Sequence, residues 1–156
     1  MAKKKSEHYV NNKELLAALI DYRAEVAVAK TKDLPKPRIN NYLGSCFLKI
    51  ATHLSYKPNF VNYMFRDDMI SDGIENCVQY IHNFDPNKSK NPFAYFTQIV
   101  YFAFLRRIAK EKRQQSIREK IIEKSGFDQI FHTDGDVDPA TLNNIKNRIE
   151  MNNRYQ

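Results

Sequence analysis

A run of aromatic residues that leads directly into a run of basic residues is the part of this sequence best suited to chemistry on a nucleic acid. The aromatic residues are Phe93, Tyr95, Phe96, Tyr101, Phe102 and Phe104. From Arg106 to Lys124, eight basic residues stand against three acidic ones. Aromatic rings stack on unpaired bases, and basic side chains neutralise phosphates. The order of the two runs therefore predicts a surface for nucleic acid.

The same two runs also have an ordinary structural interpretation. Aromatic residues at helical spacing form helical cores, because they bury large apolar areas wherever they pack, and a basic run is often a solvated helix face. Two observations favour a partner instead. The stretch from Phe93 to Leu105 is apolar nearly all the way round a helix. In the basic run, Arg107 with Glu111 is the one opposite-charge pair at i,i+4 spacing.

An acidic amphipathic segment precedes the aromatic run. Its apolar residues recur at helical spacing and predict one buried face; they are Ile70, Ile74, Cys77, Val78 and Ile81. The residues expected to stay in water are Asp68, Asp72, Glu75 and Asn76. An exposed acidic face beside a basic surface suggests a docking site for a protein next to a site for nucleic acid.

The sequence predicts no catalytic site, no metal site and no cofactor. Asp134, Asp136 and Asp138 have the spacing of the first ligands in a calcium loop, but the sixth position is Pro139 and the twelfth is Ile145. Calcium loops have Gly and Glu there. The four histidines are scattered, with no Cys or carboxylate at ligand spacing to complete a site. With four glycines in all, the chain has no phosphate-cradling loop.

Length and charge favour one domain with a polyanionic partner. A chain of 156 residues is enough for one core and an appendage, since single domains typically have about 100–150 residues. The formal charge of +7 and the sequence pI near 9.4 favour phosphate contacts. A membrane surface is the competing polyanion, but no apolar run approaches the ~20 residues of a spanning helix.

Cysteine usage and the first residues predict a cytoplasmic protein. Cys46 and Cys77 both stand inside helical patterns and are expected to be small buried residues in a reducing compartment. Met1-Ala-Lys-Lys-Lys5 is followed by Ser6-Glu7-His8 rather than by the apolar stretch of a signal peptide. We therefore expect a soluble, intracellular chain without a membrane partner.

Caps and proline positions predict the elements that carry these residues. Asn12 is expected to cap a helix that runs to about Lys30, and residues 31–38 form a linker that contains Pro35 and Pro37. A second helix is expected over residues 39–55, and a short connecting helix contains Phe60, Met64 and Phe65.

The acidic and aromatic segments are expected to be separate helices. The acidic helix covers residues 66–83, and the turn residues 85–90 follow it. Asn91 then caps a helix that begins at Pro92 and runs to about Lys124. Gly126 ends it, and residues 140–153 form one weak helix. No segment alternates long enough for a sheet, so the predicted class is all-α.

These residues resemble region 2 of the sigma-70 family. The resemblance covers roughly residues 39–113, about half of the chain. It is carried by Asp68-Met-Ile-Ser-Asp-Gly73, Phe84-Asp85, Tyr95-Phe-Thr97 and Arg106-Arg-Ile-Ala109. A narrower likeness is to the late-transcription sigma factors of large tailed bacteriophages, and it is carried by Tyr9-Val-Asn-Asn-Lys-Glu-Leu-Leu16, Asp72-Gly-Ile-Glu75, His82-Asn-Phe-Asp85 and Lys90-Asn-Pro92.

The resemblance implies three regions, two partners and a place of action. It implies an N-terminal helix and linker over 1–38, a compact helical region 2-like domain over 39–125, and a partly flexible appendage over 126–156. It implies binding to the β′ clamp helices of the host core RNA polymerase through Asp68, Ser71, Asp72, Glu75, Asn76 and Gln79. It implies promoter DNA binding through Lys88, Lys90, Tyr95, Gln98, Ile99, Phe102, Leu105, Arg106, Arg107, Lys110 and Arg113. The place of action is the cytoplasm of an infected bacterium.

Several positions depart from the family pattern. Bacterial housekeeping factors have two adjacent tryptophans where this chain has Gln98 and Ile99, and a Gln and a Thr where it has Phe102 and Leu105. The chain is also too short for the −35-reading region 4, which implies a minimal factor. Related phage factors use a coactivator and hold the replication sliding clamp by a hydrophobic, acidic tail. The nearest segment of that composition here is internal, at Phe127–Phe131.

Three functions follow from these observations. The first is a non-catalytic minimal sigma factor that binds core polymerase and opens an A·T-rich −10-type late promoter. The second is an autonomous DNA-binding transcription regulator with a recognition helix in the major groove. The third is a polymerase-binding appropriator that makes no DNA contact.

Overall fold

The computed structural model describes residues 8–124, 140, 143–144 and 147–148. Its regular structure is helical throughout this part of the chain, which confirms the predicted all-α class. The helices are α1 (Asn12–Thr31), α2 (Asn41–Ser55), α3 (Arg66–Tyr80), the 3₁₀ turn η1 (Ile81–Asn83) and α4 (Pro92–Lys124). The predictions for Gly126, Phe127–Phe131, the aspartates at 134–138 and most of the helix over 140–153 lie outside the described residues.

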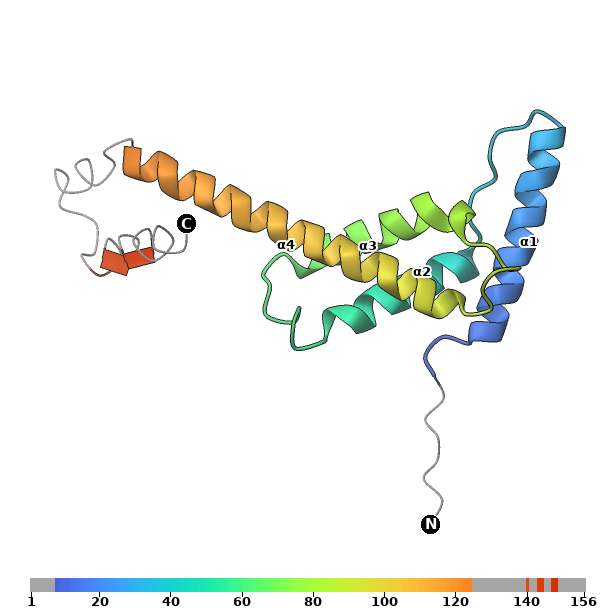
Figure 1. The fold of residues 1–156 in the computed structure, drawn as a ribbon, viewed down its shortest axis with the longest axis horizontal. Helices are drawn as coiled ribbons and strands as arrows, with labels where there is room; N and C mark the ends of the chain where they lie inside the picture. The colour runs from blue at the N-terminus through green and yellow to red at the C-terminus, as the bar shows by residue number, and fades with distance from the viewer. Residues whose placement is uncertain (1–7, 125–139, 141–142, 145–146, 149–156) are drawn as a thin grey trace, which may run out of the picture. The chain divides into compact units, whose positions relative to one another are not determined.

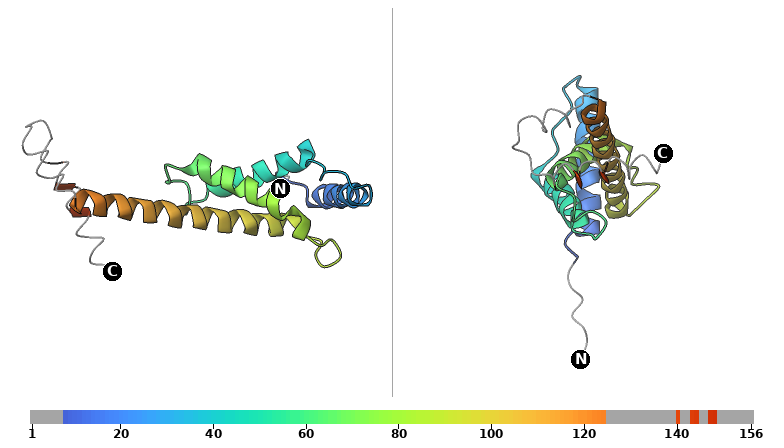
Figure 2. Two further views of the ribbon diagram at one scale, coloured as in Figure 1. Left: turned by 90° about the horizontal axis from the view of Figure 1, so that it is seen from above. Right: turned by 90° about the vertical axis from the view of Figure 1, so that its left-hand side faces the viewer.

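The chain divides into two units, Met1–Arg107 and Ile108–Gln156. The helices α1, α2 and α3 and the first half of α4 belong to the first unit. Figures 1 and 2 show α3 running alongside the first half of α4, with α2 next to α3, while α1 crosses near the start of α4. No helix among the described residues is long and apolar enough to cross a membrane.

The N-terminus of α1 shows that the predicted cap was one residue late. Asn11 is the cap, and its side chain accepts from the backbone N–H groups of Lys13 and Glu14. Asn12 lies inside the helix and contacts the start of α4 instead. Its Oδ1 accepts from Phe93 N at 3.1 Å, and its Nδ2 donates to Lys90 O at 3.3 Å. This side chain therefore satisfies backbone groups at the beginning of a second helix.

The segment between α2 and α3 was predicted as a short helix, and the prediction is wrong. Isolated turns connect the two helices, closed by bonds such as Phe60 N to Lys57 O at 2.8 Å. Phe60 is buried and its ring packs edge-on against Phe104, whereas Met64 is 96% exposed. A helix would bring Phe60 and Met64, four positions apart, to one face. Only Phe60 is buried in the core, so the two residues do not share a buried helix face.

The buried face of α3 is rotated from the predicted one. Its buried residues are Met69, Gly73 and Cys77, continued by Ile81 in η1, while Ile70, Ile74 and Val78 are half-buried. The predicted helix to Asn83 also tightens into a 3₁₀ turn from Ile81 onward. The reason for the rotation is Gly73, because a Cβ at this position would lie 3.0 Å from Val100 Cγ1 and 3.3 Å from Phe104 Cε1. The glycine lets α4 approach α3 closely.

Aromatic rings fill the core of the first unit. Phe47 of α2 lies 4.7 Å from Phe96 of α4, centroid to centroid, and Phe84 lies 6.2 Å from Phe96. Both cysteines are free and buried, as predicted. Burial raises the pKa of the Cys77 thiol to about 12, so this thiol stays neutral and packs as a small apolar side chain. Two of the six residues of the aromatic run, Phe96 and Phe104, are buried in this core, in line with the structural interpretation of its spacing.

We expect Gly73→Ala and Gly44→Ala to change stability in opposite directions. Alanine is favoured over glycine inside a helix by about 1 kcal/mol, and a Cβ at Gly44 meets only Ile39 Cδ1 at 4.0 Å. A Cβ at Gly73 instead overpacks the α3–α4 contact, at a typical cost of about 1–3 kcal/mol. Urea denaturation should show a gain for Gly44→Ala and a loss for Gly73→Ala. Equal gains would show that Val100 moves aside and that Gly73 does not limit the approach of the helices.

Candidate functional site

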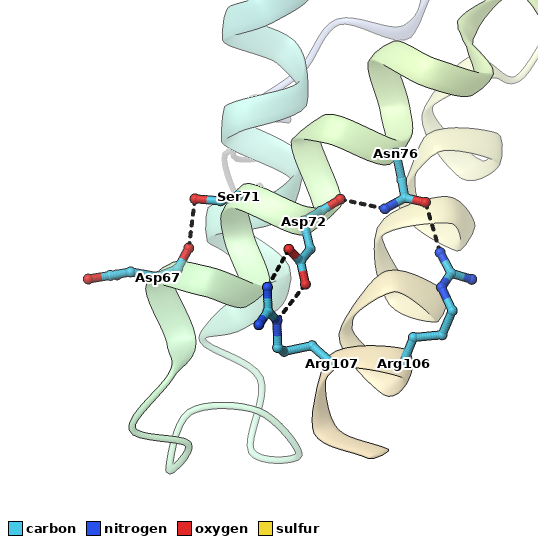
Figure 3. Close-up of polar contacts among 6 residues, drawn as sticks. All are labelled: Asp67, Ser71, Asp72, Asn76, Arg106 and Arg107. Carbon is cyan, nitrogen blue, oxygen red and sulfur yellow. Dashed lines mark hydrogen bonds and ion pairs between the residues drawn. The ribbon is translucent and has the colours of Figure 1, made fainter. Parts of the chain in front are cut away.

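The contact between α3 and α4 brings together residues that were predicted to bind different partners. Asp72 of α3 accepts from Arg107 of α4 through both carboxylate oxygens, with Nε at 2.6 Å from Oδ2 and Nη2 at 2.7 Å from Oδ1 (Figure 3). This bidentate geometry is the strongest form of an arginine–carboxylate contact. Asp72 is half-buried, so the prediction that it stays in water is wrong.

A second polar contact continues this seam. Arg106 Nη2 donates to Asn76 Oδ1 at 2.9 Å, and Asn76 Nδ2 donates to the Asp72 carbonyl oxygen at 2.7 Å (Figure 3). Both polar groups of the Asn76 amide are therefore used, one within α3 and one toward α4. We call the four residues Asp72, Asn76, Arg106 and Arg107 the α3–α4 seam.

The predicted polymerase-binding residues share one face of α3. Their spacing of three and four positions places them on one side of a helix, and they are Asp68, Ser71, Asp72, Glu75, Asn76 and Gln79. Asp68, Ser71, Glu75 and Gln79 are exposed, whereas the two members of the seam are half-buried. Ser71 donates to the Asp67 carbonyl oxygen at 3.0 Å (Figure 3). The acidic charge that remains most accessible on this face is that of Asp68 and Glu75.

The predicted DNA-binding residues of α4 also share one helix face, opposite the core. The same spacing argument applies to Tyr95, Gln98, Ile99, Phe102, Leu105 and Arg106. Phe102 and Leu105 are 47% and 40% exposed, and Gln98 and Arg106 are exposed as well. Tyr101 is exposed beside them and was not among the predicted residues. The exposed apolar members of this face, Tyr101, Phe102 and Leu105, are called the α4 patch below.

Tyr95 lies at the edge of this face and is partly used by the fold. Its ring centroid is 5.3 Å from that of Phe84 and 5.1 Å from that of Phe96. Its hydroxyl donates to the Tyr80 carbonyl oxygen at 3.3 Å. Burial, and then the nearby Cys77 thiol, raises the pKa of Tyr95. The side chain therefore supports the packing of α4 on the residues at either end of η1, and its ring is more buried than that of Phe102.

The predicted basic DNA-binding residues outside the seam lie in two parts of the chain. Lys88 and Lys90 are exposed in the loop that precedes α4, where the amides of Lys88 and Ser89 bond to the Asp85 carbonyl oxygen. In the second unit, the continuation of α4 carries Lys110, Lys112 and Arg113, all exposed. Further along it, Gln115 Nε2 donates to Glu119 Oε1 at 3.1 Å. All of these cations are accessible to phosphate groups.

An open cavity of about 550 Å³ lies where the first turns of α1 and α4 meet. It is lined by His8, Val10, Asn11, Asn12, Glu14, Asn91 and Phe93. Helix N-termini attract anions through unpaired N–H groups, but here the side chains of Asn11, Asn12 and Asn91 already accept from four of them. Glu14 adds a negative charge. The cavity is therefore unsuited to a phosphate, and the sequence had not predicted it.

Comparison with known proteins adds no relative to this description. No family model matches the chain, and no curated protein matches it either. Among the described residues, no cluster of three or more His, Cys, Asp or Glu side chains could hold a metal ion. The site is therefore described by its own geometry: an acidic face on α3, an exposed apolar patch on α4, and a polar seam between them.

We expect Tyr95→Ala to reduce the free energy of unfolding by about 2 kcal/mol and Phe102→Ala to reduce it by less than about 1 kcal/mol. The difference follows from the contacts of Tyr95 with Phe84 and Tyr80, because Phe102 is 47% exposed and loses less packing. Urea denaturation followed by circular dichroism measures both values. Equal losses would contradict the division of this helix face into a packed edge and an exposed patch.

Proposed function

We propose that this chain is a minimal sigma factor that binds core RNA polymerase and directs the recognition and opening of an A·T-rich −10-type late promoter. The observation that carries the proposal is the exposed α4 patch with Arg106 beside it. Exposed apolar side chains that gather on one helix face can mark an interaction site. Unpaired bases are suitable occupants, because each stacked base contributes ~1–3 kcal/mol.

The charge distribution supports the same proposal. Phosphate groups would meet Arg106, which follows Leu105 of the patch in the chain, and elsewhere the exposed lysines before α4. On α3, Asp68 and Glu75 are exposed and suit a basic surface on a partner protein. The resemblance to sigma region 2 assigns these two surfaces to promoter DNA and to the β′ clamp helices, respectively. The proposal does not require a coactivator or the sliding clamp as a further partner.

The exposed patch separates this function from its two alternatives. An autonomous regulator reads duplex DNA through polar and basic side chains in the major groove, and the apolar members of the patch have no such role. A polymerase-binding appropriator without DNA contact leaves the patch unexplained. A gel shift with and without core polymerase distinguishes all three, since the proposed factor binds its promoter specifically only when polymerase is present.

We expect Phe102→Ala to reduce open-complex formation on a duplex promoter about tenfold, because one stacking platform worth ~1–3 kcal/mol is removed. Open-complex formation should fall less on a template that is already mismatched over the −10 region, because no free energy is needed to unpair the bases there. Permanganate footprinting measures opening on both templates. Leu48→Ala is the control, because Leu48 is similarly exposed, at 50%, but lies on a different helix, α2. A similar loss for Leu48→Ala, or none for Phe102→Ala, would contradict the assignment of the patch to bases.

We expect the double variant Asp68→Arg with Glu75→Arg to lose binding to core polymerase, because it places like charges opposite a basic partner. Asp72 is left unchanged, since a third arginine there would face Arg107 within the fold. Asp21→Arg with Glu25→Arg makes the same charge change at two exposed positions on α1 and is the control. Pull-down of the β′ subunit measures both. Retained binding by the α3 variant, or loss by the α1 variant, would rule out docking at α3.

A further inference from the structure

The continuation of α4 in the second unit carries two isoleucines that lie in water. Ile117 is 41% exposed and Ile121 is 60% exposed. They stand four positions apart, so they lie next to each other on one face of the helix. Exposed aliphatic residues at this spacing are the anchors by which an amphipathic helix contacts another apolar surface.

Three cations share this face with the isoleucines. Arg113 precedes Ile117 by four positions, and Lys120 and Lys124 follow it by three and seven, so all three lie on the same side of the helix. All three are exposed. Within the described part of the chain, none of them takes part in a hydrogen bond or an ion pair. We call Arg113, Ile117, Lys120, Ile121 and Lys124 the basic face of α4.

The acidic residues of this half of α4 lie outside the basic face. Glu111 and Glu119 stand on a different stripe of the helix together with Gln115, whose Nε2 donates to Glu119 Oε1 at 3.1 Å. Both glutamates are half-buried, whereas every residue of the basic face is exposed. Glu123 lies about 120° round the helix from Ile117. The basic face therefore combines positive charge with apolar area and contains no carboxylate.

Three kinds of negatively charged partner suit a basic surface, and the isoleucines distinguish them. Nucleic-acid phosphates pair with cations and leave aliphatic side chains in water. An anionic membrane takes up a wide apolar face, commonly with aromatic residues, and this face has two aliphatic side chains. An acidic amphipathic helix uses both features, because its apolar residues cover the isoleucines and its carboxylates pair with the flanking cations.

We infer that the basic face of α4 binds an acidic amphipathic helix of a partner protein. The contact is small, since the face spans about three helical turns, and small interfaces are typical of transient complexes. The inference does not depend on the proposed function. It uses residues of the second unit alone, whereas the α4 patch and the acidic face of α3 belong to the first unit.

A pair of synthetic peptides tests this inference with the full chain. The first is a labelled peptide of about 20 residues, long enough to form a helix, with leucine on one face and glutamate beside it. The second has lysine in place of every glutamate. We expect the acidic peptide to bind about tenfold more tightly at low salt, because it alone complements the cations. Fluorescence anisotropy measures both affinities. Equal affinities, or no binding of the acidic peptide at about 0.1 mM protein, would overturn the inference.

Ile117→Ser with Ile121→Ser tests the apolar part of the contact. We expect the acidic peptide to bind about tenfold more weakly, while the affinity for a labelled single-stranded oligonucleotide changes less than about twofold. Ile20→Ser with Val28→Ser is the matched control, because these side chains of α1 are 48% and 51% exposed. Retained peptide affinity in the α4 variant, or an equal loss in the α1 variant, would rule out the assignment. An equal loss of oligonucleotide affinity would identify a nucleic-acid surface and also overturn the inference.

Lys120→Glu with Lys124→Glu tests the charged part and serves as a second check if the serine variant does not fold. We expect the preference between the two peptides to reverse, because the variant now repels the acidic one. Circular dichroism measures the helical content of each variant. An unchanged preference contradicts the inference. Cosedimentation of the parent with phosphatidylserine vesicles, lost in the Ile117→Ser and Ile121→Ser variant and without peptide binding, would assign the face to a membrane instead.

Discussion

The close approach of α3 and α4 at Gly73 is the constraint on which the rest of the first unit depends. With no Cβ at this position, Val100 and Phe104 lie directly against the α3 backbone. The buried face of α3 then centres on Met69, Gly73 and Cys77. Asp72, next to the glycine, is brought to the rim of the contact, where it faces α4. The polar seam is therefore a geometric consequence of apolar packing.

The close approach of α3 and α4 also determines which side chains of α4 are buried and which are exposed. Val100 and Phe104 lie against Gly73 of α3, Phe96 packs against Phe47 of α2, and all three are buried. Phe102 and Leu105 remain in water. A core assignment and a binding assignment for the aromatic run are therefore compatible, because they apply to different faces of one helix.

The charged residues of the folded chain are paired in a way that their order in the sequence does not suggest. The acidic segment and the basic run look like two independent surfaces for two partners. In the first unit Asp72 and Arg107 neutralise each other, and Arg106 donates to the uncharged amide of Asn76. Arg106 stays exposed, as do Lys88 and Lys90 before α4 and Lys110, Lys112 and Arg113 in its continuation.

Local signals in the sequence determined α4 and the helical class, whereas only the tertiary structure decided the seam. Asn91 and Pro92 act within one turn of chain, so the start of α4 was predicted correctly. The pairing of Asp72 with Arg107 spans 35 positions, and nothing local selects this arginine from the eight cations of the basic run. That choice depends on which residue of α4 lies opposite Asp72, and the packing around Gly73 sets it.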